Sequence, residues 1–277
     1  RNVLPAPFLA PRLAIVPGVA VALAVLLWIL IVLFGNGLAA IDWNLFTHDT
    51  PAPGTEGGGI RNAIVGSLMI VGLAVLVSTP VGILAGIYLT EYGDRSRTAE
   101  LTRLVTDIML SAPSIVLGLF VYAIAVATVG NFSGYAGSLA LSLIAIPVVM
   151  RTTENMLRLV PGSLREAAFA LGAPRWKVST MVTLRAAKSG VITGLLLAIA
   201  RISGETAPLL FTALNNQFFS TDMNAPMANL PVVIFQFALS PYENWVRLAW
   251  GGALLITLSV LILNVVARVF LREKNRV

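Results

Sequence analysis

Long apolar runs separated by short polar segments dominate the hydrophobic pattern of this chain. Each of six runs has about the 20 residues that a helix needs to cross the hydrocarbon core of a bilayer. The runs cover residues 13–34, 60–89, 104–129, 138–159, 190–211 and 246–270. The pattern therefore predicts an all-α integral membrane protein with six transmembrane helices.

Prolines and one short apolar segment modify this picture. Pro80 predicts a kink in the second helix, and Pro113 predicts an interruption in the third. Residues 230–239 are apolar but too few to span the bilayer. We expect them to form a re-entrant or interfacial segment, or a face for an external partner.

The composition agrees with a membrane protein. Of the 277 residues, 57% are hydrophobic and 12% are charged, and the mean hydropathy is +0.86. A soluble domain carries about a quarter charged residues. The chain has no cysteine, which excludes disulfides and thiolate metal sites, and its one histidine, His48, lies in a predicted loop. We therefore expect no metal site.

The distribution of positive charge predicts the orientation. The net charge of +6 would suit nucleic acid, but most Lys and Arg residues lie between the apolar runs, which argues against a nucleic-acid partner. Residues 35–59 contain no Lys or Arg, whereas residues 91–103 and the C-terminal end are basic. By the positive-inside rule, we expect the first of these segments to be external and both termini to be cytoplasmic.

Between the fourth and fifth runs lies a polar, basic stretch. Ser163 and Glu166 have the spacing of a capping box, Gly172 suits the left-handed position after a helix, and Pro174 suits the first position of a new helix. We predict two short helices, at about 163–171 and 174–186. An ordinary basic cytoplasmic loop is the alternative interpretation.

The fifth apolar run carries two charged residues. Arg201 lies about 12 residues into the run, which places it about 18 Å deep, near the midplane. A charge there costs at least ~2.5 kcal/mol on insertion scales, so Arg201 is expected to face protein or water and to have a partner. Glu205, one turn later, is the expected partner. The pair is either a structural tether or a gate at which a passing anion competes for Arg201.

A second pair lies nearer the cytoplasmic side. Arg151 and Glu154 are separated by three residues in the fourth run, and Asp107 follows Arg103 by four, the spacing of an intrahelical pair. The guanidinium fork suits phosphate because it donates two hydrogen bonds at once. Without further information, these residues indicate only an intramembrane charge compatible with an anion.

Three segments carry a resemblance to a known family. Glu166-Ala167-Ala168, followed after three residues by Gly172, is similar to the EAA loop of ABC importer permeases, although Leu184-Arg185 stands where that family usually has Leu-Pro. Together with residues 151–155 and 201–210, this loop resembles the PstA-type permease subunits of bacterial phosphate-specific ABC importers. The similarity runs from about Ile60 to the C-terminus and is weaker before it.

The resemblance implies a type I ABC importer permease fold in the bacterial cytoplasmic membrane. It implies an N-terminal helix and external loop at 1–59, a permease domain at 60–277, and coupling helices at about 163–186. The phosphate pathway would involve Arg151, Glu154, Arg201 and Glu205. The residues expected to dock the ATPase are Arg165, Glu166, Ala167, Ala168, Gly172 and Arg175.

The partners are likewise implied by the resemblance. A separate ABC ATPase would bind ATP and Mg²⁺, a homologous PstC-like permease would complete the pathway, and an external phosphate-binding protein would deliver the substrate. The chain itself is expected to hold no cofactor.

Motifs of catalysis are missing from the sequence. It contains no G-x-x-x-x-G-K-[ST] phosphate loop, H-E-x-x-H or G-x-S-x-G. We therefore expect a transport subunit and not an enzyme. Two alternatives stay open: an ABC permease for another oxyanion such as molybdate or sulfate, and an autonomous ion-coupled anion carrier that uses Glu205 and Glu154 as proton sites.

Overall fold

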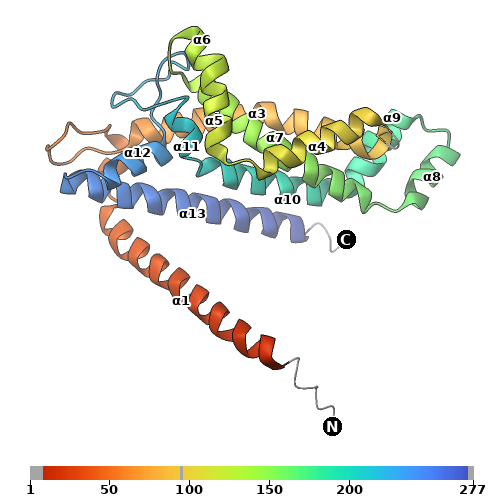
Figure 1. Ribbon diagram of the computed structural model, residues 1–277, viewed down its shortest axis with the longest axis horizontal. Coiled ribbons are helices and arrows are strands. Elements are labelled where there is room, and N and C mark those ends of the chain that lie inside the picture. The colour runs from red at the N-terminus through yellow and green to blue at the C-terminus, as the bar shows by residue number, and fades with distance from the viewer. Residues whose placement is uncertain (1–8, 94–95, 274–277) are drawn as a thin grey trace.

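The computed structural model describes residues 9–93 and 96–273, in which every regular element is helical (Figure 1). The elements are α1 (Leu9–Ala40), α2 (Trp43–Thr47), α3 (Arg61–Ile87), η2 (Tyr88–Tyr92), α4 (Arg97–Ser111), α5 (Ser114–Val121), η3 (Tyr122–Val126), α6 (Ala127–Val129), α7 (Gly134–Arg158), α8 (Gly162–Ala170), α9 (Arg175–Lys177), η4 (Val178–Thr183), α10 (Leu184–Ser203), α11 (Ala207–Leu210), α12 (Leu230–Ala238) and α13 (Glu243–Glu273).

Five helical segments are long and apolar enough to cross a membrane, and a bent pair makes a sixth. The five are Pro17–Ala40, Arg61–Tyr92, Gly134–Arg158, Arg175–Ser203 and Glu243–Val265, and the bent pair is Arg97–Ser111 with Ser114–Val129. The predicted class, an all-α membrane protein with up to six spans, is confirmed.

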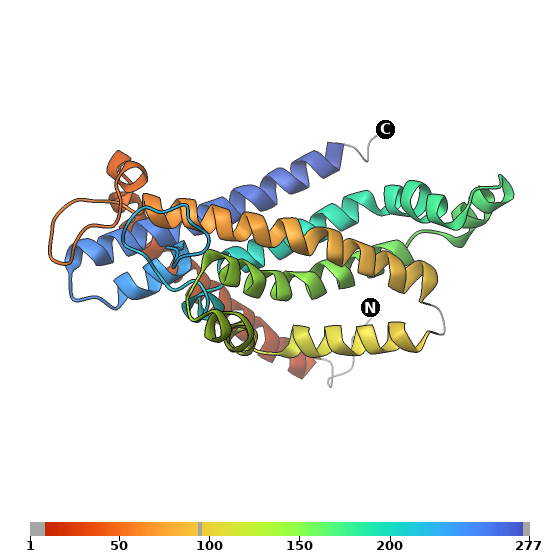
Figure 2. The ribbon, with the colours of Figure 1, turned by 90° about the horizontal axis from the view of Figure 1, so that it is seen from above.

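Glycines allow the central helices to approach closely (Figure 2). A Cβ atom added to Gly82 of α3 would lie 2.7 Å from the Cβ of Val149 on α7, and one added to Gly194 of α10 would lie 2.6 Å from the Cβ of Thr152. Such distances leave no room for a larger side chain, so α3 and α10 each pack closely against α7 at these glycines, as small residues permit in membranes. Helix α7 is the centre of this packing.

The third predicted span, over 104–129, is bent at the interruption predicted for it, and it begins earlier, at Arg97. Helices α4 and α5 meet at 107° across Ala112 and Pro113. Pro113 has no amide hydrogen to donate, and the residue before a proline is driven to extended geometry, which Ala112 adopts (φ −68°, ψ 139°). The predicted interruption at Pro113 is therefore confirmed, and α5 rises out of the bundle beyond it (Figure 1).

The second coupling helix and the fifth span were predicted as separate helices at 174–186 and 190–211, which is wrong. They form one helical segment, Arg175–Ser203. The segment ends before Gly204, and Pro208 then occupies the first turn of the short α11, where its missing amide hydrogen is tolerated. Arg201 consequently lies in the last turn of α10.

The short apolar segment 230–239 forms α12, which is too short to span. The Asn229 side chain caps its N-terminus by accepting a hydrogen bond from the Val232 amide at 3.1 Å. Val232, Val233 and Phe237 are buried, and α12 packs against α13 and α3. One face of this segment thus belongs to the core of the helical bundle.

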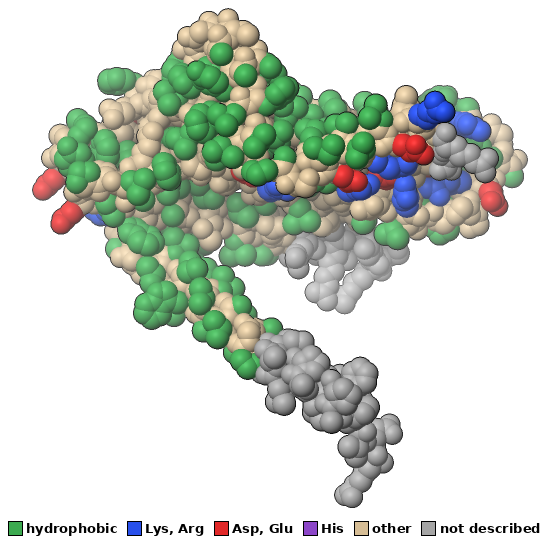
Figure 3. Space-filling model, viewed as in Figure 1, with side chains coloured by type: hydrophobic (Ala, Val, Ile, Leu, Met, Phe, Trp, Pro, Cys, Tyr) green, Lys and Arg blue, Asp and Glu red, His purple; other side chains and the backbone are tan. Residues whose placement is uncertain are grey.

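Helix α1 diverges from the rest of the molecule (Figure 1). It contacts α13 near its own C-terminal end, where the Cβ of an alanine at Gly37 would lie 2.7 Å from the Cβ of Leu254. Apolar side chains cover its described surface (Figure 3), as expected for a helix surrounded by lipid or by another membrane chain.

Candidate functional site

The Arg201–Glu205 pair sits at a break in the helices. Arg201 is in the last turn of α10, and Glu205 follows the end of that helix at Gly204. The Nε atom of Arg201 lies 3.8 Å from a Glu205 carboxylate oxygen, and the Arg201 side chain is 45% exposed. This distance is an ionic contact but exceeds hydrogen-bond length. The predicted pairing is confirmed, and it is loose.

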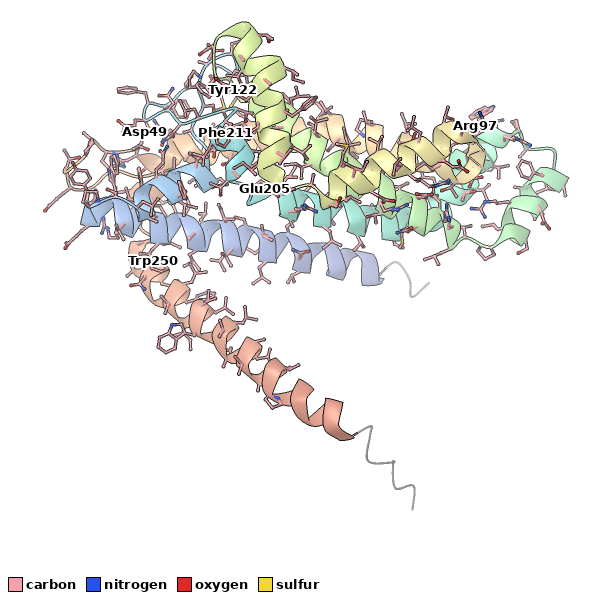
Figure 4. All side chains as sticks on the ribbon, viewed as in Figure 1. Asp49, Arg97, Tyr122, Glu205, Phe211 and Trp250 are labelled. Carbon is pink, nitrogen blue, oxygen red and sulfur yellow. The ribbon has the colours of Figure 1, made fainter. Side chains whose placement is uncertain are left out.

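Close packing positions the segment that carries Glu205. A Cβ atom added to Gly118 of α5 would lie 2.5 Å from the Cα of Pro208, and one added to Gly137 of α7 would lie 3.2 Å from a Leu209 methyl group. The short α11 is therefore held between α5 and α7. Glu205 lies between Asp49 and Arg97 along the length of the molecule (Figure 4).

Glu154 is the centre of a second, tighter cluster. Its side chain is 1% exposed, and three arginines contact it. One carboxylate oxygen accepts from Arg103 at 2.8 Å and from Arg158 at 2.7 Å, whereas the other accepts from Arg151 at 3.3 Å. A buried carboxylate needs such partners, because an unpaired charge in a low-dielectric interior is strongly unfavourable.

The cluster joins α4 to α7. Arg103 also donates to the Leu89 carbonyl at 2.8 Å, and Arg151 also donates to Asp107 at 2.5 Å. The predicted intrahelical pair of Arg103 with Asp107 is therefore wrong, since each of these residues reaches across to α7 instead. The predicted Arg151–Glu154 contact is confirmed.

Sequence reasoning missed Arg103 and Arg158 as partners of Glu154. For Arg158 a signal existed, because it follows Glu154 by four residues in the acid-then-base order that favours a helix pair. Arg103 is 51 residues away from Glu154, and only the packing of α4 on α7 brings the two together.

The two arginine levels are separated along the bundle. Gly194 of α10 contacts Thr152, the neighbour of Arg151 on the antiparallel α7. Arg201 lies seven residues beyond Gly194, towards the end of the molecule formed by α2 and α12, which at 1.5 Å per residue is about 10 Å. Arg151 is 34% exposed. The structure thus presents two partly exposed arginine side chains at different levels along the bundle.

The predicted docking segment projects from the opposite end of the molecule (Figure 2). Glu166, Ala167, Gly172 and Arg175 are exposed, and Ala168 is half-buried. Gly172 has φ +75°, which confirms the predicted left-handed turn between the two helices. The prediction of a capping box with Ser163 at the N-cap is wrong. The N-cap residue of α8 is Pro161, and no side chain caps that end of the helix.

Arg165 differs from the other docking candidates because it is bound within the chain. Its side chain is 21% exposed and contacts Glu91 at 3.1 Å. It also donates to the carbonyl oxygens of Leu157 and Val160, both at 2.8 Å. Leu157 is in the last turn of α7, and Val160 lies two residues beyond the end of that helix. Arg165 therefore fixes α8 to α7 and to η2.

No three His, Asp or Glu side chains converge as a metal site would require, within the residues that the structure describes. The charged clusters found there are ion pairs between arginines and carboxylates, and the guanidinium group is suited to charge-assisted hydrogen bonds with oxyanions.

Comparison with known proteins gives a family match and close relatives. Residues 78–273 match the family described as "Binding-protein-dependent transport system inner membrane component". The phosphate transport system permease protein PstA of Yersinia pestis is 57% identical over 267 residues, which cover 95% of this chain and 90% of that protein. PstA of Haemophilus influenzae is 58% identical over 257 residues, covering 93% and 91%.

Solved structures share the fold at low identity. A chain of a bacterial alginate ABC transporter, in complex with a pentasaccharide-bound periplasmic protein, aligns with a TM-score of 0.70 and 14% identity, covering 96% of this chain and 95% of that one. A chain of the inward-facing MetNI methionine ABC transporter aligns with a TM-score of 0.62 and 18% identity, covering 76% and 95%. The architecture is therefore that of type I ABC importer permeases.

Proposed function

Because the chain belongs to the family of binding-protein-dependent inner membrane transport components, with phosphate permeases as close relatives, we propose a pathway by which it moves phosphate. The chain is the transmembrane permease subunit of an ATP-driven ABC importer of inorganic phosphate. It is a multi-pass membrane protein and a transport subunit. What we propose is which residues bind phosphate during transport and in what order.

Arg201 and Arg151 are the two levels at which phosphate is bound in passing. The observation that carries this assignment is the Arg201–Glu205 contact at 3.8 Å, because the exposed guanidinium is only weakly engaged by its carboxylate. A phosphate that approaches Arg201 competes with one carboxylate and forms shorter, charge-assisted hydrogen bonds. Arg151, about 10 Å further along the bundle, is the next cation it meets.

The carboxylates keep phosphate binding weak. Glu205 neutralises Arg201 when no substrate is present, and Asp107 and Glu154 do the same for Arg151. Since a carrier must release what it binds, a permanently unpaired arginine at either level would hold the anion too tightly.

The pathway is completed by a second, homologous PstC-like permease. Arg151 and Arg201 are partly exposed on a single chain, which supports a conduit enclosed between two chains and not within one. An ABC importer also requires an ATPase and an external binding protein, here one that delivers phosphate to the loops near α2 and α12. ATP and Mg²⁺ are held by the ATPase.

The ATPase docks on α8 and the first turn of α9. Glu166 and Arg175 supply exposed charges, and Phe169, Leu171 and Trp176 supply exposed apolar surface at this projecting end. This end faces the cytoplasm, because exposed Lys and Arg side chains gather there (Figure 3) and the positive-inside rule places them inside. Both termini are then cytoplasmic as well.

The test is the uptake of labelled phosphate by vesicles that contain the complete complex. We expect Arg201→Gln to abolish ATP-driven uptake, because phosphate is then bound too weakly. We expect Glu205→Gln to slow uptake, because phosphate is then released too slowly. Arg247→Gln, an exposed arginine at the start of α13, is the matched control and should transport normally. A pull-down checks that the ATPase stays bound in each variant. Normal uptake by Arg201→Gln would contradict the assignment.

A further inference from the structure

Three residues of the Glu154 cluster lie on one face of α7. Arg151, Glu154 and Arg158 are spaced by three and four residues, so their side chains follow one another along the helix. Arg151 and Arg158 contact different oxygen atoms of the same carboxylate, at 3.3 and 2.7 Å. Besides Arg103 of α4, two arginines of α7 thus share Glu154 as a counter-ion, and the second of these, Arg158, has no part in the pathway proposed above.

A cavity of about 430 Å³ lies beside Arg158 at the α8 end of the molecule. Its lining residues are Leu89, Thr90, Glu91, Arg158 and Arg165. The volume exceeds the ~30 Å³ share of one water molecule many times over, so a hydrated phosphate group fits. The Arg158 side chain is 56% exposed, and in the described chain it donates one side-chain hydrogen bond, to Glu154, although a guanidinium group carries five N–H donors.

The charges around this cavity favour an anion. The charged residues that line the cavity are two arginines, Arg158 and Arg165, and one carboxylate, that of Glu91. One positive charge therefore remains in excess. Arg103 holds Glu154 in place from α4 and is itself anchored on the Leu89 carbonyl, so Glu154 need not move when an arginine on α7 takes another partner.

We propose that this cavity is a further phosphate-binding site, in which Arg158 takes up the anion after Arg151. The proposal rests on the function above and extends its pathway by one step towards the ATPase-docking end. Arg158 lies seven residues, or about 10 Å, beyond Arg151 along α7. Glu154 neutralises Arg158 while phosphate is on Arg151, and it neutralises Arg151 after phosphate has moved. Glu91, which also lines the cavity, limits the affinity and so favours release.

The first test is the equilibrium binding of labelled inorganic phosphate to the complete complex in nanodiscs without nucleotide. We expect Arg158→Gln to weaken binding about tenfold, the usual effect of losing a charge-assisted hydrogen bond. Arg158→Lys should restore part of the affinity. Arg97→Gln, an exposed arginine on α4 that does not line the cavity, should bind as wild type does. Equal affinity of Arg158→Gln and wild type, or no binding by the wild-type complex, would overturn the proposal.

Two further measurements distinguish the transported anion from a lipid headgroup as the ligand of the cavity. Because a lipid headgroup carries the same chemistry, binding is compared in zwitterionic nanodiscs and in nanodiscs containing phosphatidylglycerol. Equal affinity supports a site for the transported anion, and loss of phosphate binding in the anionic discs shows a lipid site and overturns the proposal. The Arg201→Gln complex should retain phosphate binding at the cavity. A failure of the Arg158 site can therefore be distinguished from a failure of the Arg201 assignment.

Transport kinetics test the position of the site in the sequence of steps. Because Arg158 acts after the anion has passed Arg151, Arg158→Gln should lower the maximal uptake rate several-fold and leave the half-saturating external phosphate concentration unchanged. A rise in that concentration at an unchanged maximal rate would show that Arg158 acts at the outer side, contrary to the proposal.

Discussion

The two carboxylates associated with the pathway differ in how firmly they are held. Glu205 makes a single contact of 3.8 Å, whereas the buried Glu154 receives hydrogen bonds from three guanidinium groups. A loose pair is suited to exchange its partner for an anion. A buried carboxylate with three partners is suited to stay in place and organise the residues around it.

The stability of the bundle should therefore depend on Glu154. Glu154→Gln removes the negative charge and leaves three arginines near one another, two of them partly buried. Removing one partner of a buried ion pair costs about 3–5 kcal/mol. We expect a lower midpoint of thermal unfolding for the purified complex.

Glu100→Gln on α4 provides the control, because that carboxylate is exposed and its loss should leave the midpoint within experimental error. If Glu154→Gln unfolds at the wild-type temperature, the three contacts contribute little to the fold, and Glu154 has only the role of a counter-ion.

At the level of elements, the question is how movement of α8 reaches the pathway. Arg165 connects α8 to the Leu157 carbonyl of α7, to the Val160 carbonyl just after that helix, and to Glu91 of η2. Helix α7 also carries Arg151, Glu154 and Arg158. Under the proposed function, a displacement of α8 by the ATPase is transmitted through Arg165 to the helix that holds the anion-binding residues.

Substitution of Arg165 should uncouple ATP hydrolysis from phosphate uptake. In Arg165→Gln the ATPase remains bound, because its contacts lie on the exposed residues of α8 and α9, but α8 is no longer fixed to α7. We expect phosphate uptake per ATP hydrolysed to fall several-fold, with Arg165→Lys intermediate because it keeps the charge opposite Glu91 and loses the fork that reaches two carbonyls. The ratio is measured in vesicles with the complete complex. If the ATPase instead dissociates, Arg165 is a docking residue.

Several elements were predictable because their signals are local. The apolar runs place α3, α7 and α13, and Gly172 ends α8 through the left-handed geometry that glycine adopts without strain. Pro113 marked the break between α4 and α5, although not its angle of 107°.

Other features depend on distant contacts or on signals that hydropathy conceals. The apolar run 190–211 continues past the end of α10, so Arg201 was placed in mid-helix although Gly204 and Pro208 follow it. Arg103 was missed as a partner of Glu154 because it lies 51 residues away and depends on the packing of α4 against α7. Thus the pairs within one helical stretch, Arg151 with Glu154 and Arg201 with Glu205, were predictable from sequence, and the contact between helices required the structure.

On the scale of the whole molecule, the apolar surface indicates that this chain does not act alone. Helix α1 diverges from the bundle, the anion-binding arginines are partly exposed, and the docking helices project beyond the membrane-spanning segments (Figures 1 and 2). Under the proposed function, a single chain provides half of an enclosed pathway, a second permease closes it, and an ATPase moves α8.

The most direct measurement compares phosphate uptake by proteoliposomes that contain the complete complex with uptake by proteoliposomes that contain this chain only, each with ATP inside and with phosphate-binding protein outside. We predict ATP-dependent accumulation of labelled phosphate by the complete complex, unaffected by excess molybdate or sulfate, and no accumulation by the single chain. Accumulation by the single chain without an ATPase, or loss of phosphate uptake in the presence of the competing oxyanions, would contradict the account.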